Sequence, residues 1–171
     1  MAKLEGPRGR DIIAAIKQAG VTHVAALPDI VTSDGLLWPV SRDRDLKFIR
    51  VCKEDEGVSI CAALALCDVR AVMMMQMTGL LDSLNTIRGV VVDFSEPVCM
   101  IVGLLGKEPG TPPTQSKRFG VRIVEPILDA MGIDHFCMEG PEDVARLAPA
   151  IVRAYETSRP MVALVGRPVA P

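Results

Sequence analysis

The chain has few aromatic residues and lacks any long apolar run. Only 4% of its 171 residues are aromatic, so its core must be built from aliphatic side chains, with nine Met to fill irregular gaps. No run approaches the roughly 18 apolar residues that a membrane helix needs. The amino-terminal segment MAKLEGPRGR has no apolar stretch either. We therefore expect no signal peptide, no membrane partner and a cytoplasmic location.

Positive charge and metal-ligand clusters are scarce as well. The formal net charge is -2, which argues against a nucleic-acid partner because phosphate backbones require a basic surface. The two His and five Cys show no C-x-x-C pair or other short ligand spacing. We expect no metal ligands in this chain, and we interpret the thiols as reduced core residues.

Several catalytic motifs are missing too. The chain has no G-x-x-x-x-G-K-[ST] loop, no G-x-G-x-x-G after its first apolar run and no G-x-S-x-G elbow. These absences argue against a nucleotide enzyme with its own phosphate loop and against a serine hydrolase.

Short apolar runs alternate with helical patterns along the chain. The runs lie at residues 21–27, 47–52, 70–75, 98–104, 134–138 and 161–165. The helical patterns lie at residues 12–19, 58–67, 84–92, 126–131 and 144–155. Continuous apolar runs are typical of strands covered on both faces. The order predicts one α/β domain over residues 1–171, with three layers and a six-stranded, mostly parallel sheet between helices.

Ligands of such sheets bind where the strands end. The segments that follow the first four strands are 28–29, 53–57, 76–82 and 106–115. The last of them, GKEPGTPPTQ, is rich in Gly and Pro and indicates a mobile loop. The remaining segments carry two polar clusters.

The first cluster consists of three acids, Glu54, Asp55 and Glu56, at the start of a helix. Acids in a first turn commonly complement the helix dipole or cap the helix. The alternative is that one of them is partly buried and exchanges a proton with a ligand nitrogen. The residues alone leave both interpretations open.

The second cluster runs from Gln76 to Asn85, after a strand with three consecutive Met, and enters a helix that Asp82 or Ser83 is expected to cap. Gly79 in this cluster is either an ordinary turn glycine or a position where a flat ligand approaches the backbone.

Taken together, the two clusters resemble a known family. Residues 53–63, KEDEGVSICAA, are similar to the family's R-E-E-E-G-V-G-I-C-A-G, and residues 75–85, MQMTGLLDSLN, are similar to M-Q-N-S-G-L-G-N-S-I-N. Residues 27–29, LPD, resemble its first-strand exit. Over nearly its whole length the chain resembles the alpha subunit of sulfopyruvate decarboxylase and the matching domain of phosphonopyruvate decarboxylase, both thiamine-diphosphate decarboxylases.

The resemblance implies a pyrimidine-binding domain with one catalytic glutamate. In the family this glutamate bonds N1′ of the cofactor's aminopyrimidine, and the cofactor is the electron sink for decarboxylation. It lies nine residues before a small residue of the next helix. Counting back from Ala63 gives Glu54, with Glu56 as the alternative.

The resemblance also implies roles for the strand exits. We expect Thr78, Gly79 and Leu80 to bind the cofactor. We expect the following residues to face substrate or partner: Asp29, Gln76, Met77, Asp82 and Asn85. Met77 and Leu81 are bulkier and more apolar than their family counterparts, which favours a less anionic 2-oxo acid than sulfopyruvate.

A missing motif completes the expectation. In the family, Mg²⁺ and the diphosphate are held by a G-D-G motif in a different domain, and this chain has no G-D-G. The resemblance therefore implies a hetero-oligomer in which a beta subunit holds Mg²⁺ and the diphosphate, with thiamine diphosphate at the interface. Three alternatives stay open: an inactive scaffold or regulatory subunit, a thiamine-dependent carboligase, and an unrelated small α/β enzyme acting through Glu54, Asp29 and His23.

Overall fold

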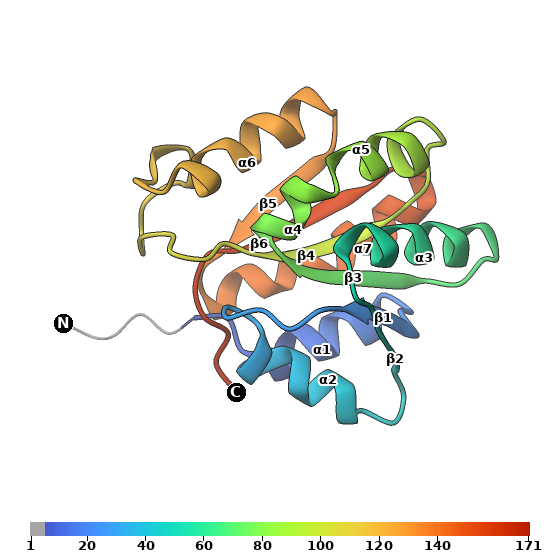
Figure 1. Ribbon diagram of the computed structural model, residues 1–171. Coiled ribbons are helices and arrows are strands. Elements are labelled where there is room, and N and C mark those ends of the chain that lie inside the picture. Colours follow the sequence, from blue (N-terminus) through green and yellow to red (C-terminus); the bar gives the residue numbers. More distant parts are fainter. Residues whose placement is uncertain (1–5) are drawn as a thin grey trace.

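The computed structural model describes residues 6–171 (Figure 1). The first five residues, which belong to the segment where we expect no signal peptide, lie outside the described part. Six strands form one sheet in the order β2-β1-β3-β4-β6-β5. The strands are β1 (His23–Ala26), β2 (Lys47–Arg50), β3 (Ala71–Gln76), β4 (Cys99–Gly103), β5 (Asp134–Met138) and β6 (Met161–Val165). Every pairing is parallel, which confirms the predicted α/β class.

Helices cover both faces of this sheet (Figure 1). One face carries α1 (Gly9–Gln18), the π-helical turn η1 (Ser33–Leu37), α2 (Trp38–Arg42), the 3-10 segment η4 (Pro141–Arg146) and α7 (Leu147–Thr157). The other face carries α3 (Glu54–Leu66), α4 (Met77–Asp82), α5 (Leu84–Thr86), the π-helical segment η2 (Ile87–Val92) and α6 (Phe119–Ala130). A short 3-10 turn, η3 (Pro113–Gln115), precedes α6. Among the described residues, no helix is long and apolar enough to cross a membrane.

The two faces of the sheet form two separate cores because successive side chains of a strand point in opposite directions. In β3, Val72 and Met74 pack with α1 and α7, whereas Met73 and Met75 pack with α3 and α6. All four side chains are fully buried. Burial on both faces explains why the strands appear in the sequence as continuous apolar runs.

One helix prediction was wrong in its bounds, and another in its cap. The helix expected at residues 126–131 is the second half of α6, which begins at Phe119 and contains Pro126 in its interior. The proline removes one backbone donor, but the buried face formed by Val121, Val124 and Leu128 keeps the helix continuous. The helix expected at 84–92 is present, as α5 followed directly by η2. A turn at Ser83 separates it from α4, and neither Asp82 nor Ser83 caps it with its side chain, so the predicted cap was wrong.

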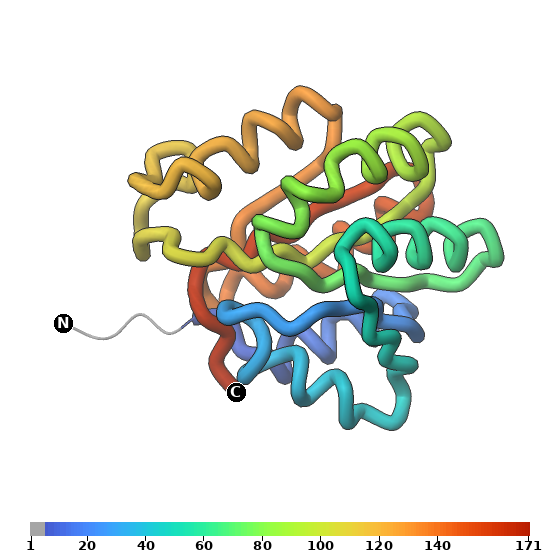
Figure 2. The backbone as a smooth tube through the Cα atoms, viewed as in Figure 1, coloured from blue at the N-terminus to red at the C-terminus, as the bar shows by residue number. Residues whose placement is uncertain are grey.

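The two ends of the described chain run side by side (Figure 2). The Gly9 amide donates to the Ala170 carbonyl at 2.7 Å, and the Ala170 amide donates to the Pro7 carbonyl at 2.9 Å. The Val169 amide donates to the Val31 carbonyl at 3.0 Å. The carboxy-terminal segment therefore covers the start of η1 and fixes the loop that follows β1.

Candidate functional site

Parallel pairing brings the predicted strand exits to one edge of the sheet. Gln76, the last residue of β3, pairs with Gly103, the last residue of β4. A Cβ atom added at Gly103 would lie 3.0 Å from Oδ1 of Asp29, which follows β1. The exits of β1, β3 and β4 thus lie next to one another, as the sequence predicts.

Glu54 and Gly79 are in direct contact at this edge. Glu54 is the first residue of α3, and Gly79 lies in α4. A Cβ atom at Gly79 would overlap the Cγ and carboxyl atoms of Glu54. The glycine is therefore needed for the approach of a side chain from the neighbouring helix. The sequence suggested that a flat ligand could approach the Gly79 backbone closely. In the structure the Glu54 side chain lies against that backbone.

The three acids at the start of α3 have different surroundings. Glu56 accepts a hydrogen bond from the Cys52 amide at 2.9 Å, so it closes the turn before α3. Asp55 accepts one from the Glu56 amide at 2.9 Å and lies 3.6 Å from the Lys53 ammonium. Glu54 is half-buried, and no residue in the described part of the chain donates a hydrogen bond to it or pairs with its charge. Of the three carboxylates, Glu54 is the one available to a ligand.

The surroundings of Glu54 are acidic. Lys53 is the cation beside this helix start, and its ammonium lies 3.6 Å from Asp55 and 3.9 Å from Asp82. Asp82 is exposed and joins the end of α4 to the start of α3 through this ion pair. Glu54, Asp55 and Glu56 all lie in the first turn of α3.

The predicted residues Gln76 and Thr78 lie on the open side of this edge. The Gln76 side-chain amide donates to the Thr78 hydroxyl at 2.8 Å. Gln76 also lines an open hollow of about 450 Å³ together with Pro28, Asp29 and Ile30. This volume is in the range of small-molecule sites. A ligand in the hollow could contact the Gln76 side chain, which in turn bonds the exposed Thr78 hydroxyl.

The carboxylate of Asp29 holds the turn beside this hollow. Oδ1 accepts the amides of Val31 at 2.6 Å and Thr32 at 2.9 Å, and Oδ2 accepts the Thr32 hydroxyl. The side chain is buried and holds the turn between β1 and η1. These three hydrogen bonds give Asp29 a structural role in the turn after β1.

Three further predicted residues differ in their exposure. Leu80 is fully buried, so a ligand could meet only its backbone. Met77 is 9% exposed and packs toward α6, where a Cβ at Gly120 would lie 3.3 Å from its Cε. Its bulk therefore fills the core. Asn85 is exposed and accepts hydrogen bonds from Arg88 at 3.1 and 3.3 Å, one helix further along the chain.

The alternative set of Glu54, Asp29 and His23 is not assembled. His23 is the first residue of β1 and therefore lies at the amino edge of the sheet, opposite Glu54. Its Nδ1 lies 2.8 Å from the Thr22 hydroxyl. Burial and the nearby Lys47 lower the pKa of His23 below its usual value. A joint active site of these three residues would need them at one edge.

The sequence did not single out an ionic cluster at the far end of the same edge. Lys107 is buried and pairs with Glu139, and Arg167 lies 3.4 Å from the same carboxylate. Glu139 and Arg167 follow β5 and β6. They therefore also lie at the edge where the strands end and where ligands of such sheets bind. The Gly110 amide donates to Glu139 at 3.0 Å, which anchors the loop that its composition indicates to be mobile.

The five thiols are all free, but only some are core residues. Cys61 and Cys99 are buried, and burial raises the pKa of Cys61 to about 12. Cys52 and Cys67 are exposed, so the prediction that the thiols are core residues was wrong for these two. Both lie just beyond the end of an element, Cys52 after β2 and Cys67 after α3, where the direction of the side chain depends on the turn.

The donor set at the edge fits part of a thiamine cofactor. An unpaired carboxylate beside a polar amide and hydroxyl suits an aminopyrimidine ring, which carries both hydrogen-bond donors and acceptors. Within residues 6–171, no group of three or more His, Cys, Asp or Glu side chains could hold a metal ion. The donor set at this edge therefore fits the ring portion of the cofactor.

No family model matches the chain. Three curated proteins are similar to it. Sulfopyruvate decarboxylase of Methanosarcina acetivorans is 29% identical over 155 residues, which cover 90% of this chain and 38% of that protein. Sulfopyruvate decarboxylase subunit alpha of Methanococcus maripaludis is 25% identical over 141 residues and 80% of each chain. The subunit alpha of Methanocaldococcus jannaschii is 25% identical over 154 residues, which cover 90% of this chain and 89% of that one.

These comparisons confirm the resemblance to the sulfopyruvate decarboxylase alpha subunit. The chain spans 38% of the length of the Methanosarcina protein and most of the length of the two subunits named alpha.

Proposed function

We propose that this chain is the pyrimidine-binding subunit of a thiamine-diphosphate-dependent decarboxylase that acts on a small 2-oxo acid. The observation that carries the proposal is the Glu54 carboxylate. It lies at the ligand edge of the sheet against Gly79, and no described residue satisfies it. The relatives named sulfopyruvate decarboxylase support the class of reaction.

Glu54 is the proposed activating acid. Its carboxylate holds a proton between its own oxygen and N1′ of the aminopyrimidine, which is a general acid–base role. Thiamine diphosphate, when bound, supplies the electron sink that accepts the electron pair released by decarboxylation. Thr78 and the Gly79 and Leu80 backbone are proposed to line the ring, and Gln76 to face the substrate.

The proposal includes a second subunit. This chain has no G-D-G motif, so Mg²⁺ and the diphosphate are assigned to a beta subunit, and the cofactor to the interface of a hetero-oligomer. The Methanosarcina relative supports this division, because this chain matches only 38% of it and the remainder has room for another domain. We place the complex in the cytoplasm, in keeping with the free thiols.

The substrate is proposed to be less anionic than sulfopyruvate. The half-buried Leu81 is more apolar than its family counterpart. Met77, which suggested the same, is buried and does not contribute. Rates with sulfopyruvate, phosphonopyruvate and apolar 2-oxo acids would rank these substrates directly, and a preference for sulfopyruvate would contradict this part of the proposal.

The test compares two matched variants in the complex with the partner chain. Glu54→Gln removes the exchangeable carboxylate, and we expect the decarboxylation rate to fall by about 100-fold or more. Glu56→Gln keeps an oxygen acceptor for the Cys52 amide, so its rate should stay near that of the wild type. Full activity of Glu54→Gln would refute the assignment of Glu54 as the activating acid and favour the alternative that this chain is an inactive scaffold subunit. Equal losses in both variants would indicate that only the charge of the helix start matters.

A further inference from the structure

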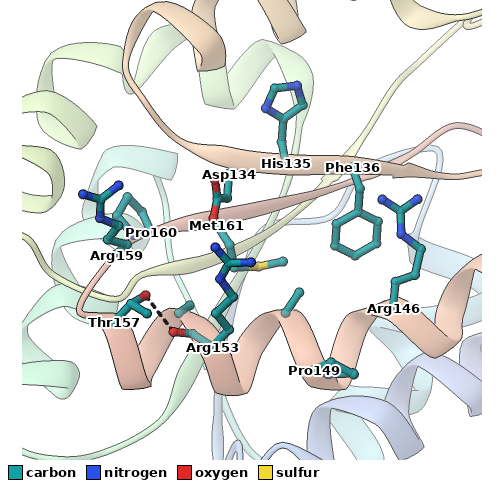
Figure 3. A pocket seen from close by; sticks show the side chains of 12 residues that line it. Asp134, His135, Phe136, Arg146, Pro149, Arg153, Thr157, Arg159, Pro160 and Met161 are labelled. Carbon is teal, nitrogen blue, oxygen red and sulfur yellow. Dashed lines mark hydrogen bonds between the residues drawn. The ribbon is translucent and has the colours of Figure 1, made fainter.

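A second hollow lies at the opposite edge of the sheet, where β5 and β6 begin. Its volume is about 370 Å³, which is in the range of small-molecule sites. It is formed between the edge strand β5, helix α7 and the turn before β6 (Figure 3). Pro149 and Ala150 of α7 contribute apolar atoms to its wall. Nothing in the proposed decarboxylase chemistry uses this hollow.

Three arginines line the hollow from different segments. Arg146 ends η4, Arg153 lies in α7, and Arg159 precedes β6. Figure 3 shows their side chains spaced along the hollow. The guanidinium of Arg146 stacks on the Phe136 ring, 4.4 Å from its centre. This contact holds one of the three cations in place.

No ion pair within the described part of the chain ties up the three positive charges. None of the three guanidinium groups makes an ion pair or hydrogen bond with a residue in the described part of the chain. Asp134 is the one acid in the lining, and it also lacks an ion pair with any described residue. Since the whole chain has a formal net charge of -2, this is a local concentration of positive charge.

Complementing a helix dipole does not account for the cluster. Cations stabilise a helix within its last turn. The last turn of α7 contains no basic residue, because Arg153 lies further back and Arg159 lies beyond the helix end. Arg146 precedes α7 altogether. The shared feature of the three residues is the hollow between them.

We propose that this hollow binds a small molecule with at least two phosphate groups. Guanidinium groups bind phosphate oxygens in pairs of parallel hydrogen bonds, and they do so better than ammonium groups. Arg146 and Arg153 are seven residues apart, about 10 Å along a helix, which suits a chain of phosphates better than one. In this arrangement Arg153 and Arg159 hold the phosphates and Arg146 closes the end near Phe136. The site lies far from Glu54 and is independent of the proposed activity.

Titration calorimetry on the full chain tests this inference, with pyrophosphate and ADP as probes. We expect saturable binding of both, with one site per chain. Arg153→Ala and Arg159→Ala should each weaken binding about tenfold or more, because each removes charge-assisted hydrogen bonds. Neither side chain makes a contact that a described residue depends on, so the thermal unfolding midpoint should not change. The matched control is Arg44→Ala, an exposed arginine outside the hollow.

Three results would overturn the inference. The first is no saturable binding of either probe at millimolar concentration. The second is an equal loss of affinity in Arg44→Ala, which would indicate non-specific charge attraction. The third is binding of a single-stranded oligonucleotide that Arg153→Ala abolishes while pyrophosphate fails to compete, which would indicate a nucleic-acid site. Glu54→Gln should leave the affinity for pyrophosphate unchanged, which separates this site from the candidate active site.

Discussion

Substitution of Gly79 by alanine gives the sharpest test of the contact at the candidate site. The added Cβ would overlap the Cγ and carboxyl atoms of Glu54. If both side chains stayed in place, overpacking would cost about 1–3 kcal/mol. The other response is rotation of Glu54 to a different staggered rotamer. No described residue holds its carboxylate, so we expect rotation, with little loss of stability.

The activity should respond far more strongly than the stability. A rotamer change moves the carboxylate by about 3 Å or more, and a misplacement of about 1 Å can cost roughly 100-fold in rate. We therefore expect kcat/KM for the 2-oxo acid to fall by about 100-fold or more in the complex. Urea denaturation of the same variant should show a change of less than about 1 kcal/mol, because alanine is the better helix former.

Two controls make the result specific to the contact. Gly89→Ala adds a methyl group in a helical segment with no atom within 4 Å of the new Cβ, so activity should be unchanged. In a Glu54→Gln background, Gly79→Ala should cost little more, because both changes remove the same positioned group. Full activity of Gly79→Ala would refute the reasoning. It would also be refuted if the double variant lost kcat/KM by the product of the two single-variant factors, because the two changes would then act independently.

Three further predictions concern the fold. Tyr155→Phe should lower the free energy of unfolding by about 1–2 kcal/mol in urea denaturation, because the hydroxyl accepts the buried Ala71 amide at 2.8 Å; an unchanged value would contradict this. The Lys17 ammonium, 2.7 Å from Asp43, lowers the pKa of that carboxyl, so Asp43→Asn should be less stable than wild type at neutral pH. That difference should vanish as the pH falls below about 4 and through the lowered pKa, and a constant difference would argue against the ion pair. Burial raises the pKa of Cys61 to about 12, so peptide mapping after reaction with a thiol reagent at about pH 8 should find it unmodified while exposed thiols react.

Much of the sheet follows from the sequence because its strands are buried on both faces. The bounds of β5 and β6 are those predicted, and the other strands differ by one or two residues at an end. The helices are less predictable where tertiary contacts decide their course. The turn η1 depends on Gly35, where an added Cβ would overlap the backbone of Val169 from the other end of the chain. No local pattern encodes that contact.

In the candidate site too, some features follow from the sequence and others depend on tertiary packing. The order of the exits at one edge follows from parallel topology, and the family motif selects Glu54 over its neighbours. The partner of Gly79 could not be predicted, because the packing of α3 on α4 places Glu54 there. Asp29 was predicted as a ligand contact because it follows a strand. Acids at such positions also close turns, and the hydrogen bonds of Asp29 show that it does so here.

The most direct test of the central claim is native mass spectrometry of the chain purified from its own cells. The account predicts a complex with a second subunit that carries thiamine diphosphate and Mg²⁺ at the shared interface. A homo-oligomer of this chain without cofactor would contradict it, and Glu54 would then be an acid that stabilises the start of α3.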